Sequence, residues 1–270
     1  MIERQTNQKP VSTREWYDFV GQLADLVPDI HPGEDEATRT LLDMCHLDAT
    51  SRVLDVGCGS GNTACLIVER YGAQVLGIDI SEMMITKAKE RARQRRLLEQ
   101  VEFRVGSVFQ MPFEDDSFDV AIFESVLTPL PGDEKQAVME IVRVIRSGGR
   151  IGANEGTVDP TTPPEFLALF DKHPAIYRYF TPQTLRSLFE ESGLQVVEMK
   201  QVKNTGTPNT RKKLGLRSLL SFLIQVYPKM LVTLLRDARL REASSIDDRL
   251  KKLGKQFMGY TLIVGQKPGQ

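Results

Sequence analysis

The chain lacks the features that mark secreted and membrane-spanning proteins. Its three cysteines, Cys45, Cys58 and Cys65, have a spacing that fits neither a disulfide framework nor a metal site. Residues 1–16 contain no apolar segment of the kind found in signal peptides. No run reaches the ~18 uninterrupted apolar residues of a membrane span. We therefore expect a reducing, cytoplasmic setting, with no bound metal.

An excess of charge of either sign is also missing. The 270 residues include 35 lysines and arginines against 36 aspartates and glutamates, a net charge of −1. Such a balance gives no general attraction to nucleic acid or to an acidic membrane. The composition, 41% hydrophobic and 26% charged, is ordinary for a soluble globular protein. The length suits one α/β domain with additions.

What is present is a strand followed by a glycine-rich turn. Residues 51–56 are apolar and β-branched, and Gly57, Gly59 and Gly61 precede a helix expected at 62–68. Glycines there can adopt positive φ and bring backbone N–H groups close to a ligand. The spacing Gly-x-Gly-x-Gly is not the Gly-x-Gly-x-x-Gly of dinucleotide-binding proteins, so no NAD site is predicted. A purely structural turn is the alternative.

A second expected strand, residues 74–78, ends at Asp79. The carboxylate falls about twenty residues after the glycines, where a nucleotide-binding βαβ unit places an acid against the ribose. An ionised carboxylate can accept hydrogen bonds from both ribose hydroxyls. The alternative is that Asp79 only caps the helix that begins near Ser81.

The segments VLDVGCGSG (53–61) and VLGIDIS (75–81) together resemble motifs I and II of the class I S-adenosylmethionine (SAM)-dependent methyltransferases. The resemblance covers roughly residues 50–200. Within the class, MPFEDDSFDVAIFESVL (111–127) and RVIRSGGR (143–150) are similar to the ubiquinone/menaquinone-biosynthesis-like branch, methyltransferase type 11. The resemblance implies S-adenosyl-L-methionine as cofactor and a small-molecule methyl acceptor.

The resemblance also implies a Rossmann-like α/β fold: a doubly wound, seven-stranded sheet with an antiparallel last strand. The alternation of expected strands and helices supports a doubly wound sheet. We expect further strands at 101–105, 118–123, 150–154, 194–201 and 257–264. The expected parts are an N-terminal helical cap (1–48), the SAM-binding core (49–202), a basic helical insertion (203–256) and the last strand of the core (257–270).

Carried over from the family, the residues after the first two strands would hold the methionine and ribose parts of SAM. Asp55 would help hold the ammonium group indirectly. Gly57, Gly59 and Gly61 would line the turn under the methionine moiety. Asp79 would bind the ribose.

The family pattern also assigns the adenine end and the fourth strand. Ile80 would pack on the adenine ring, and the Val108 backbone N–H would meet a ring nitrogen. Ser107 stands where the family commonly has Asp, a departure that keeps a hydrogen-bonding group for the adenine amino group. Glu124 matches the motif IV position, whose backbone carbonyl often meets the SAM amino group.

A general base is needed only where the acceptor must lose a proton. The candidate catalytic residues are Glu124, His173 and Tyr177, with Glu155 as a further candidate. A packing or surface role is the alternative for His173, Tyr177 and Glu155. His31, in the loop before the sheet, is expected to be a surface histidine.

The expected insertion is basic and carries an apolar run at 219–235, broken by Pro228. We expect helices that cover the acceptor pocket as a lid and exclude water. Contact with a second subunit or peripheral contact with a membrane are the alternatives. A nucleic-acid methyltransferase that uses this basic segment, and a non-catalytic SAM-binding protein, are alternative functions. Few aromatic residues in the segment argue against nucleic acid.

Overall fold

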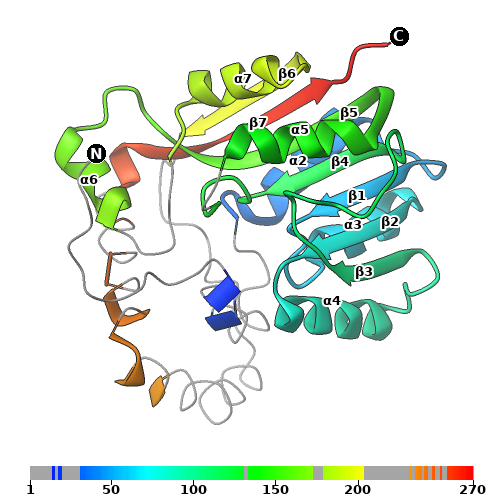
Figure 1. Ribbon diagram of the computed structural model, residues 1–270, viewed down its shortest axis with the longest axis horizontal. Helices are drawn as coiled ribbons and strands as arrows, with labels where there is room; N and C mark the ends of the chain where they lie inside the picture. Colours follow the sequence, from blue (N-terminus) through cyan, green and yellow to red (C-terminus); the bar gives the residue numbers. More distant parts are fainter. Residues whose placement is uncertain are drawn as a thin grey trace.

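The computed structural model describes residues 14–15, 18–19, 31–130, 133–172, 179–203, 231–232, 235–238, 240–242, 245–246, 250 and 254–269. These residues form a sheet covered by helices on both faces (Figure 1). The strands are β1 (Arg52–Val56), β2 (Gln74–Asp79), β3 (Val101–Val105), β4 (Phe118–Glu124), β5 (Ile145–Val158), β6 (Gln195–Lys203) and β7 (Met258–Gln266). The helices are α2 (Glu34–Cys45), α3 (Asn62–Tyr71), α4 (Glu82–Arg95), α5 (Glu134–Val144), α6 (Pro164–Lys172) and α7 (Pro182–Glu191), with a short 3-10 turn, η2 (Gly254–Gln256).

The strand order is β3-β2-β1-β4-β5-β7-β6. Strands β1 to β5 pair in parallel, and β7 lies antiparallel between β5 and β6. The predicted seven-stranded, doubly wound sheet with an antiparallel last strand is therefore confirmed. The order reverses between β1 and β4, which is the switch point where open α/β sheets bind ligands. Val56 lies beside Ile78 and Phe123, so the loops after β1, β2 and β4 leave the sheet together.

Two apolar layers hold the helices to the sheet. Helices α2, α3 and α4 pack on one face, and α5 and α7 on the other. Leu41 and Leu42 of α2 are fully buried in the same cluster as Val53 of β1 and Ile67 of α3. Helix α2 was expected within an N-terminal cap, but it forms part of the layer that covers the sheet.

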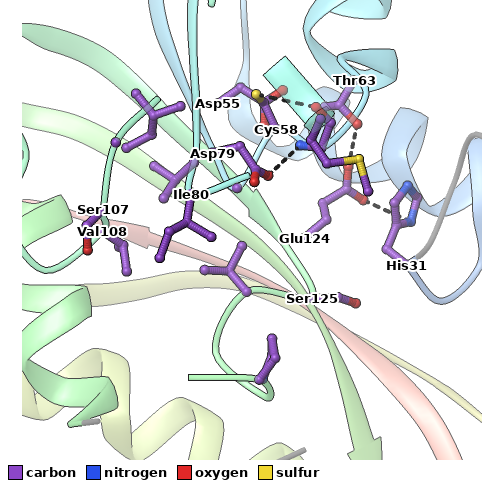
Figure 2. A pocket seen from close by; sticks show the side chains of 18 of the residues that line it. His31, Asp55, Cys58, Thr63, Asp79, Ile80, Ser107, Val108, Glu124 and Ser125 are labelled. Carbon is purple, nitrogen blue, oxygen red and sulfur yellow. Dashed lines mark hydrogen bonds and ion pairs between the residues drawn. The ribbon is translucent and has the colours of Figure 1, made fainter. Parts of the chain in front are cut away.

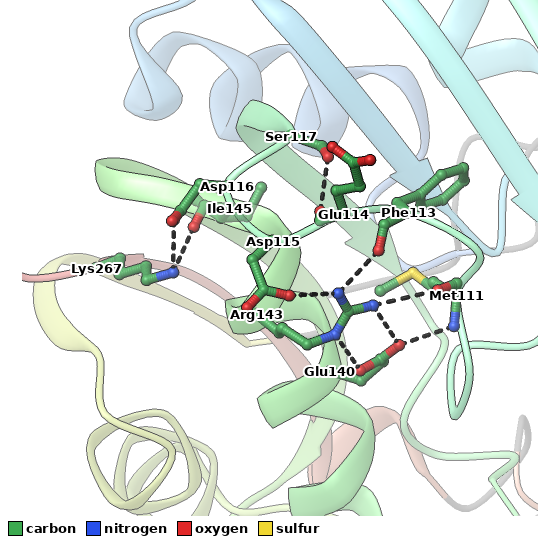
Figure 3. Close-up of polar contacts among 10 residues, drawn as sticks. All are labelled: Met111, Phe113, Glu114, Asp115, Asp116, Ser117, Glu140, Arg143, Ile145 and Lys267. Atoms are coloured by element: carbon green, nitrogen blue, oxygen red, sulfur yellow. Dashed lines mark hydrogen bonds and ion pairs between the residues drawn. The ribbon is translucent and has the colours of Figure 1, made fainter.

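The guanidinium group of Arg143, on α5, makes several hydrogen bonds to the loop between β3 and β4 (Figure 3). Arg143 donates to the carbonyls of Phe113 and Met111 at 2.8 and 3.1 Å and to the carboxylates of Asp115 and Glu140 at 2.7 and 2.8 Å. This contact lowers the pKa of Glu140. Arg143 and its partners Asp115 and Glu140, which we call the Arg143 clasp, therefore have a structural role.

Strand β5 is longer than the expected strand at 150–154, because the glycine pair at 148–149 lies within it. Gly148 has a φ of 76°, and a Cβ at Gly149 would lie 2.6 Å from the carbonyl oxygen of Asp119. The backbones therefore approach too closely for a side chain, and the β4–β5 register shifts between Phe118 and Val120.

Most of the expected insertion lies outside the described residues. Of the part that is described, Ile246 and Leu250 are buried in a small cluster with Phe166 and Phe170 of α6. Among the helices that can be described, none is both long and apolar enough to cross a membrane.

Candidate functional site

A cavity of about 350 Å³ opens at the carboxyl ends of β1 to β4. Figure 2 shows Ser107 and Val108 at one end, His31 and Glu124 at the other, and Asp79 between them. The lining residues include Arg14, His31, Asp55, Gly57, Gly59, Thr63, Asp79, Ile80, Ser107, Val108, Phe109, Glu124, Ser125 and Val126. A volume of this size suits a small-molecule ligand.

The three glycines of the turn do different things. All have positive φ: 68° at Gly57, 50° at Gly59 and 76° at Gly61. A Cβ at Gly57 would lie 2.5 Å from Val126, and one at Gly61 would lie 2.8 Å from Phe103, so packing requires these two glycines. A Cβ at Gly59 would meet no atom within 4 Å, and Gly59 lines the cavity. Gly61 does not line the cavity and instead packs against Phe103.

Asp79 braces the turn from the end of β2. One carboxylate oxygen accepts from the Gly59 N–H at 2.9 Å and the other from the Ser81 N–H at 2.8 Å. Burial raises the pKa of Asp79, while the bonds from Ser81 and Gly59 lower it. The hydroxyl of Ser81 caps α4 by accepting from the Met84 N–H, so capping is not the role of Asp79. Asp79 also lines the cavity, and its carboxylate has lone pairs left for a ligand.

Asp55 is a buried acid of the site. Its side chain is buried, and burial, followed by the charges of Glu124 and Asp79, raises its pKa well above the usual range. In the part of the chain that the structure describes, its Oδ2 atom is buried without a hydrogen-bond partner. A buried acceptor without a partner is costly, so a ligand or water that donates to it would be stabilised.

The end of the cavity near Ser107 and Val108, away from Glu124, is lined by apolar side chains. Ile80 is 38% exposed at the cavity wall, and Val108 and Phe109 lie across from the turn in the loop after β3. The hydroxyl of Ser107 accepts from the Phe109 N–H at 3.3 Å, which shapes this loop. It keeps its own proton to donate to a ligand.

Glu124 lies at the centre of a polar cluster, and Figure 2 shows its contacts with Thr63 and His31. Its carboxylate accepts from Thr63 at 2.8 Å, from Thr38 at 3.0 Å and from the Asn154 amide at 3.0 Å. His31 Nδ1 lies 3.3 Å from Oε2 of the same carboxylate.

The expectation that His31 is a surface residue is wrong, because its side chain is only 9% exposed and lines the cavity. Sequence reasoning missed it because His31 and Glu124 are far apart in the chain and no local pattern links them. Within the described residues, no cluster of acids, histidines and cysteines could hold a metal ion.

Of the remaining catalytic candidates, the structure describes Glu155 and not His173 or Tyr177. Glu155 is completely buried and does not line the cavity. His173 and Tyr177 lie outside the described residues.

Arg91 is a further residue that the sequence did not single out. Arg91, on α4, donates to the Ser60 hydroxyl at 3.1 Å and to the Asn62 side chain at 3.2 Å. Arg91 therefore holds the end of the glycine turn, at Ser60 and Asn62, against α4.

This strand order, with a glycine turn after β1 and an acid ending β2 in one cavity, defines the class I methyltransferases. A family model described as a methyltransferase domain matches residues 54–152. Methyltransferase GfsG of Streptomyces halstedii is 31% identical over 203 residues, which cover 71% of this chain and 69% of that protein. The chain therefore belongs to this methyltransferase family, within the small-molecule kind.

Two further similarities bear on function and on fold. O-methyltransferase resE of Aspergillus sclerotiorum is 30% identical over 161 residues, and the chain spans 61% of that protein and matches it over 59% of its own length. The crystal structure of the [4+2]-cyclase SpnF superposes with a TM-score of 0.76, covers 97% of this chain and 98% of its own, and is 22% identical. The second similarity shows the fold alone.

Proposed function

We propose that the chain is a SAM-dependent methyltransferase that methylates a hydroxyl group of a small molecule. The observation that carries the proposal is the convergence of Gly59, Asp79 and Glu124 in one cavity at the switch point of the sheet. Family membership supports SAM as the cofactor, and the similarity to an O-methyltransferase supports an oxygen acceptor. The three cysteines are free and buried, which fits the reducing cytoplasm proposed as its location.

The residues present fit SAM. Asp79 would accept from the ribose hydroxyls, and the open space at Gly59 leaves room for the methionine moiety. Ile80 and Val108 would pack on the adenine, with Ser107 at its polar edge. When bound, SAM supplies an electrophilic methyl group.

The cluster around Glu124 would handle the acceptor proton. As the acceptor oxygen bonds to the methyl carbon, its proton must leave, and the Glu124–His31 pair lies in the cavity to take it. Thr38, Thr63 and Asn154 hold the carboxylate in place during the transfer. The backbone carbonyl of Glu124 remains our proposed contact for the SAM amino group.

The test is a comparison of three variants with the parent protein. We expect Glu124→Gln and His31→Gln each to lower methyl transfer to hydroxylated acceptors, screened among phenols and aliphatic alcohols, about 100-fold or more. S-adenosylhomocysteine (SAH) should still bind, as measured by calorimetry. Glu198→Gln, at an exposed glutamate of β6, is the matched control and should transfer normally. Full transfer by both cluster variants would contradict the proton role.

A second candidate is a protein that uses the same cavity without transferring a methyl group. A crystal structure with nearly the same fold is described as a [4+2]-cyclase, so the fold alone does not decide between the two candidates. Release of SAH separates the two candidates, since only methyl transfer produces it.

A further inference from the structure

The loop after β4 forms part of the cavity wall in an unusual conformation. Ser125 lines the cavity with a φ of 55°, a left-handed conformation that non-glycine residues seldom adopt. Val126, next in the chain, packs against Gly57, where an added Cβ would lie 2.5 Å from its side chain. Residues held in such conformations need their surroundings to fix them.

The backbone carbonyl of Asn154 holds the Ser125 N–H at 2.9 Å, and the carboxylate of Glu155, also on the neighbouring strand β5, holds the residues that follow. This carboxylate accepts from the N–H groups of Val126 and Leu127 at 2.8 and 2.9 Å and from the Thr128 hydroxyl at 3.2 Å. Glu155 is fully buried and does not line the cavity. It therefore touches the loop and not the ligand.

We propose that Glu155 is a positioning residue for the cofactor cavity, whose ionised carboxylate holds Ser125 and Val126 in the wall. Burial raises the pKa of Glu155 to about 7, against the lowering effect of the Leu127, Val126 and Thr128 donors. Among the described residues, these uncharged donors are what face the carboxylate, and no charged neighbour accounts for the shift. Protonation near neutral pH removes the charge that strengthens the bonds from Val126 and Leu127, and a proton on the oxygen that faces Thr128 turns that acceptor into a donor. The loop is then held less tightly, so cofactor binding weakens as the pH falls.

The first experiment measures SAH affinity by calorimetry between about pH 6 and about pH 8.5. It rests on the proposed function, because SAH is the probe. We expect the affinity of the parent protein to rise about tenfold across this range, through pH 7. Glu155→Gln should bind about tenfold more weakly at the alkaline end and show a flatter profile. Glu198→Gln is the control and should follow the parent profile.

Other cavity groups, His31 and Asp79 among them, are present in both the parent and the Glu155→Gln variant. Any contribution they make to the pH profile is shared and cancels in the comparison. Identical profiles and affinities for the parent and Glu155→Gln would overturn the positioning role.

A second measurement does not depend on any ligand. The amide resonances of Val126 and Leu127 in the free protein should titrate near pH 7 in the parent and not in Glu155→Gln. Amides that do not titrate in the parent would overturn the anchoring contact. Titrating amides with no SAH binding at any pH would overturn the proposed function, and the cavity role of Glu155 with it, so the two failures are distinguishable.

Discussion

At the scale of single residues, a substitution at Gly59 tests whether the glycine turn binds a ligand or has only a structural role. Gly59→Ala should cost about 1 kcal/mol of stability through its positive φ and should also place a methyl group in the cavity. We expect SAH affinity to fall at least about tenfold by calorimetry. Gly148→Ala is the matched control, since Gly148 also has positive φ and open space but does not line the cavity. Equal SAH affinity in both variants would show that the turn is only structural.

Asp79 tests the ribose contact. Asp79→Asn keeps one acceptor oxygen but loses the charge that strengthens hydrogen bonds, each worth about 1.5–3 kcal/mol. We expect SAH to bind at least about tenfold more weakly. Asparagine is preferred to alanine because its oxygen can still accept from one of the Gly59 and Ser81 N–H groups, whereas alanine accepts from neither. Unchanged affinity in a folded Asp79→Asn variant would exclude the ribose assignment.

Glu155 also links stability to pH, in the opposite direction from its proposed effect on binding. Its pKa in the folded protein is about 7, above its ordinary value of 4.5. An acid whose pKa is raised in the folded protein binds its proton more tightly there than in the unfolded chain. The resulting stabilisation, about 3 kcal/mol, is fully present below pH 4.5 and is lost as the pH rises through 7. Between these limits, Glu155→Gln should therefore gain about this much stability relative to the parent. Urea unfolding at both ends of the range measures it, and a constant difference would contradict the burial effect.

At the scale of elements, the Arg143 side chain makes several of the contacts that join α5 to the loop before β4. Arg143→Met should lower the free energy of unfolding by about 1–2 kcal/mol, because four acceptors lose a donor and partial exposure screens the loss. Arg146→Met is the control, since the Arg146 side chain is 57% exposed in a single ion pair. Urea unfolding of both variants gives the comparison. Equal losses would mean that the clasp contributes no more than a surface pair.

Elements that carry their own local signal could be predicted from the sequence. The apolar run before Gly57 and the acid at the end of the next strand placed the turn and Asp79 at one sheet edge, which the structure confirms. The resemblance supplied the antiparallel last strand.

Contacts between distant segments could not be predicted in this way. The burial of His31 beside Glu124 and the bond from Arg91 to Ser60 depend on how α2 and α4 pack against the sheet. The strand expected at 150–154 begins earlier, at Ile145, because the glycine pair at 148–149 lies where two backbones approach closely.

At the scale of the whole molecule, the role of the insertion at 203–256 as a lid over the cavity remains a prediction. Its described part includes the exposed Leu231 and Leu235 and the buried Ile246 and Leu250, which pack near α6. A lid that excludes water would favour methyl transfer over side reactions.

The central claim is that the cavity transfers a methyl group to oxygen. The most direct test uses SAM with a deuterated methyl group together with a set of phenols and alcohols, and follows SAH and labelled product by mass spectrometry. We expect SAH and a labelled methyl ether in equal amounts, with the Glu124→Gln variant slower by about 100-fold or more. SAM that stays intact with every acceptor, or an acceptor converted without gaining the label, would contradict it.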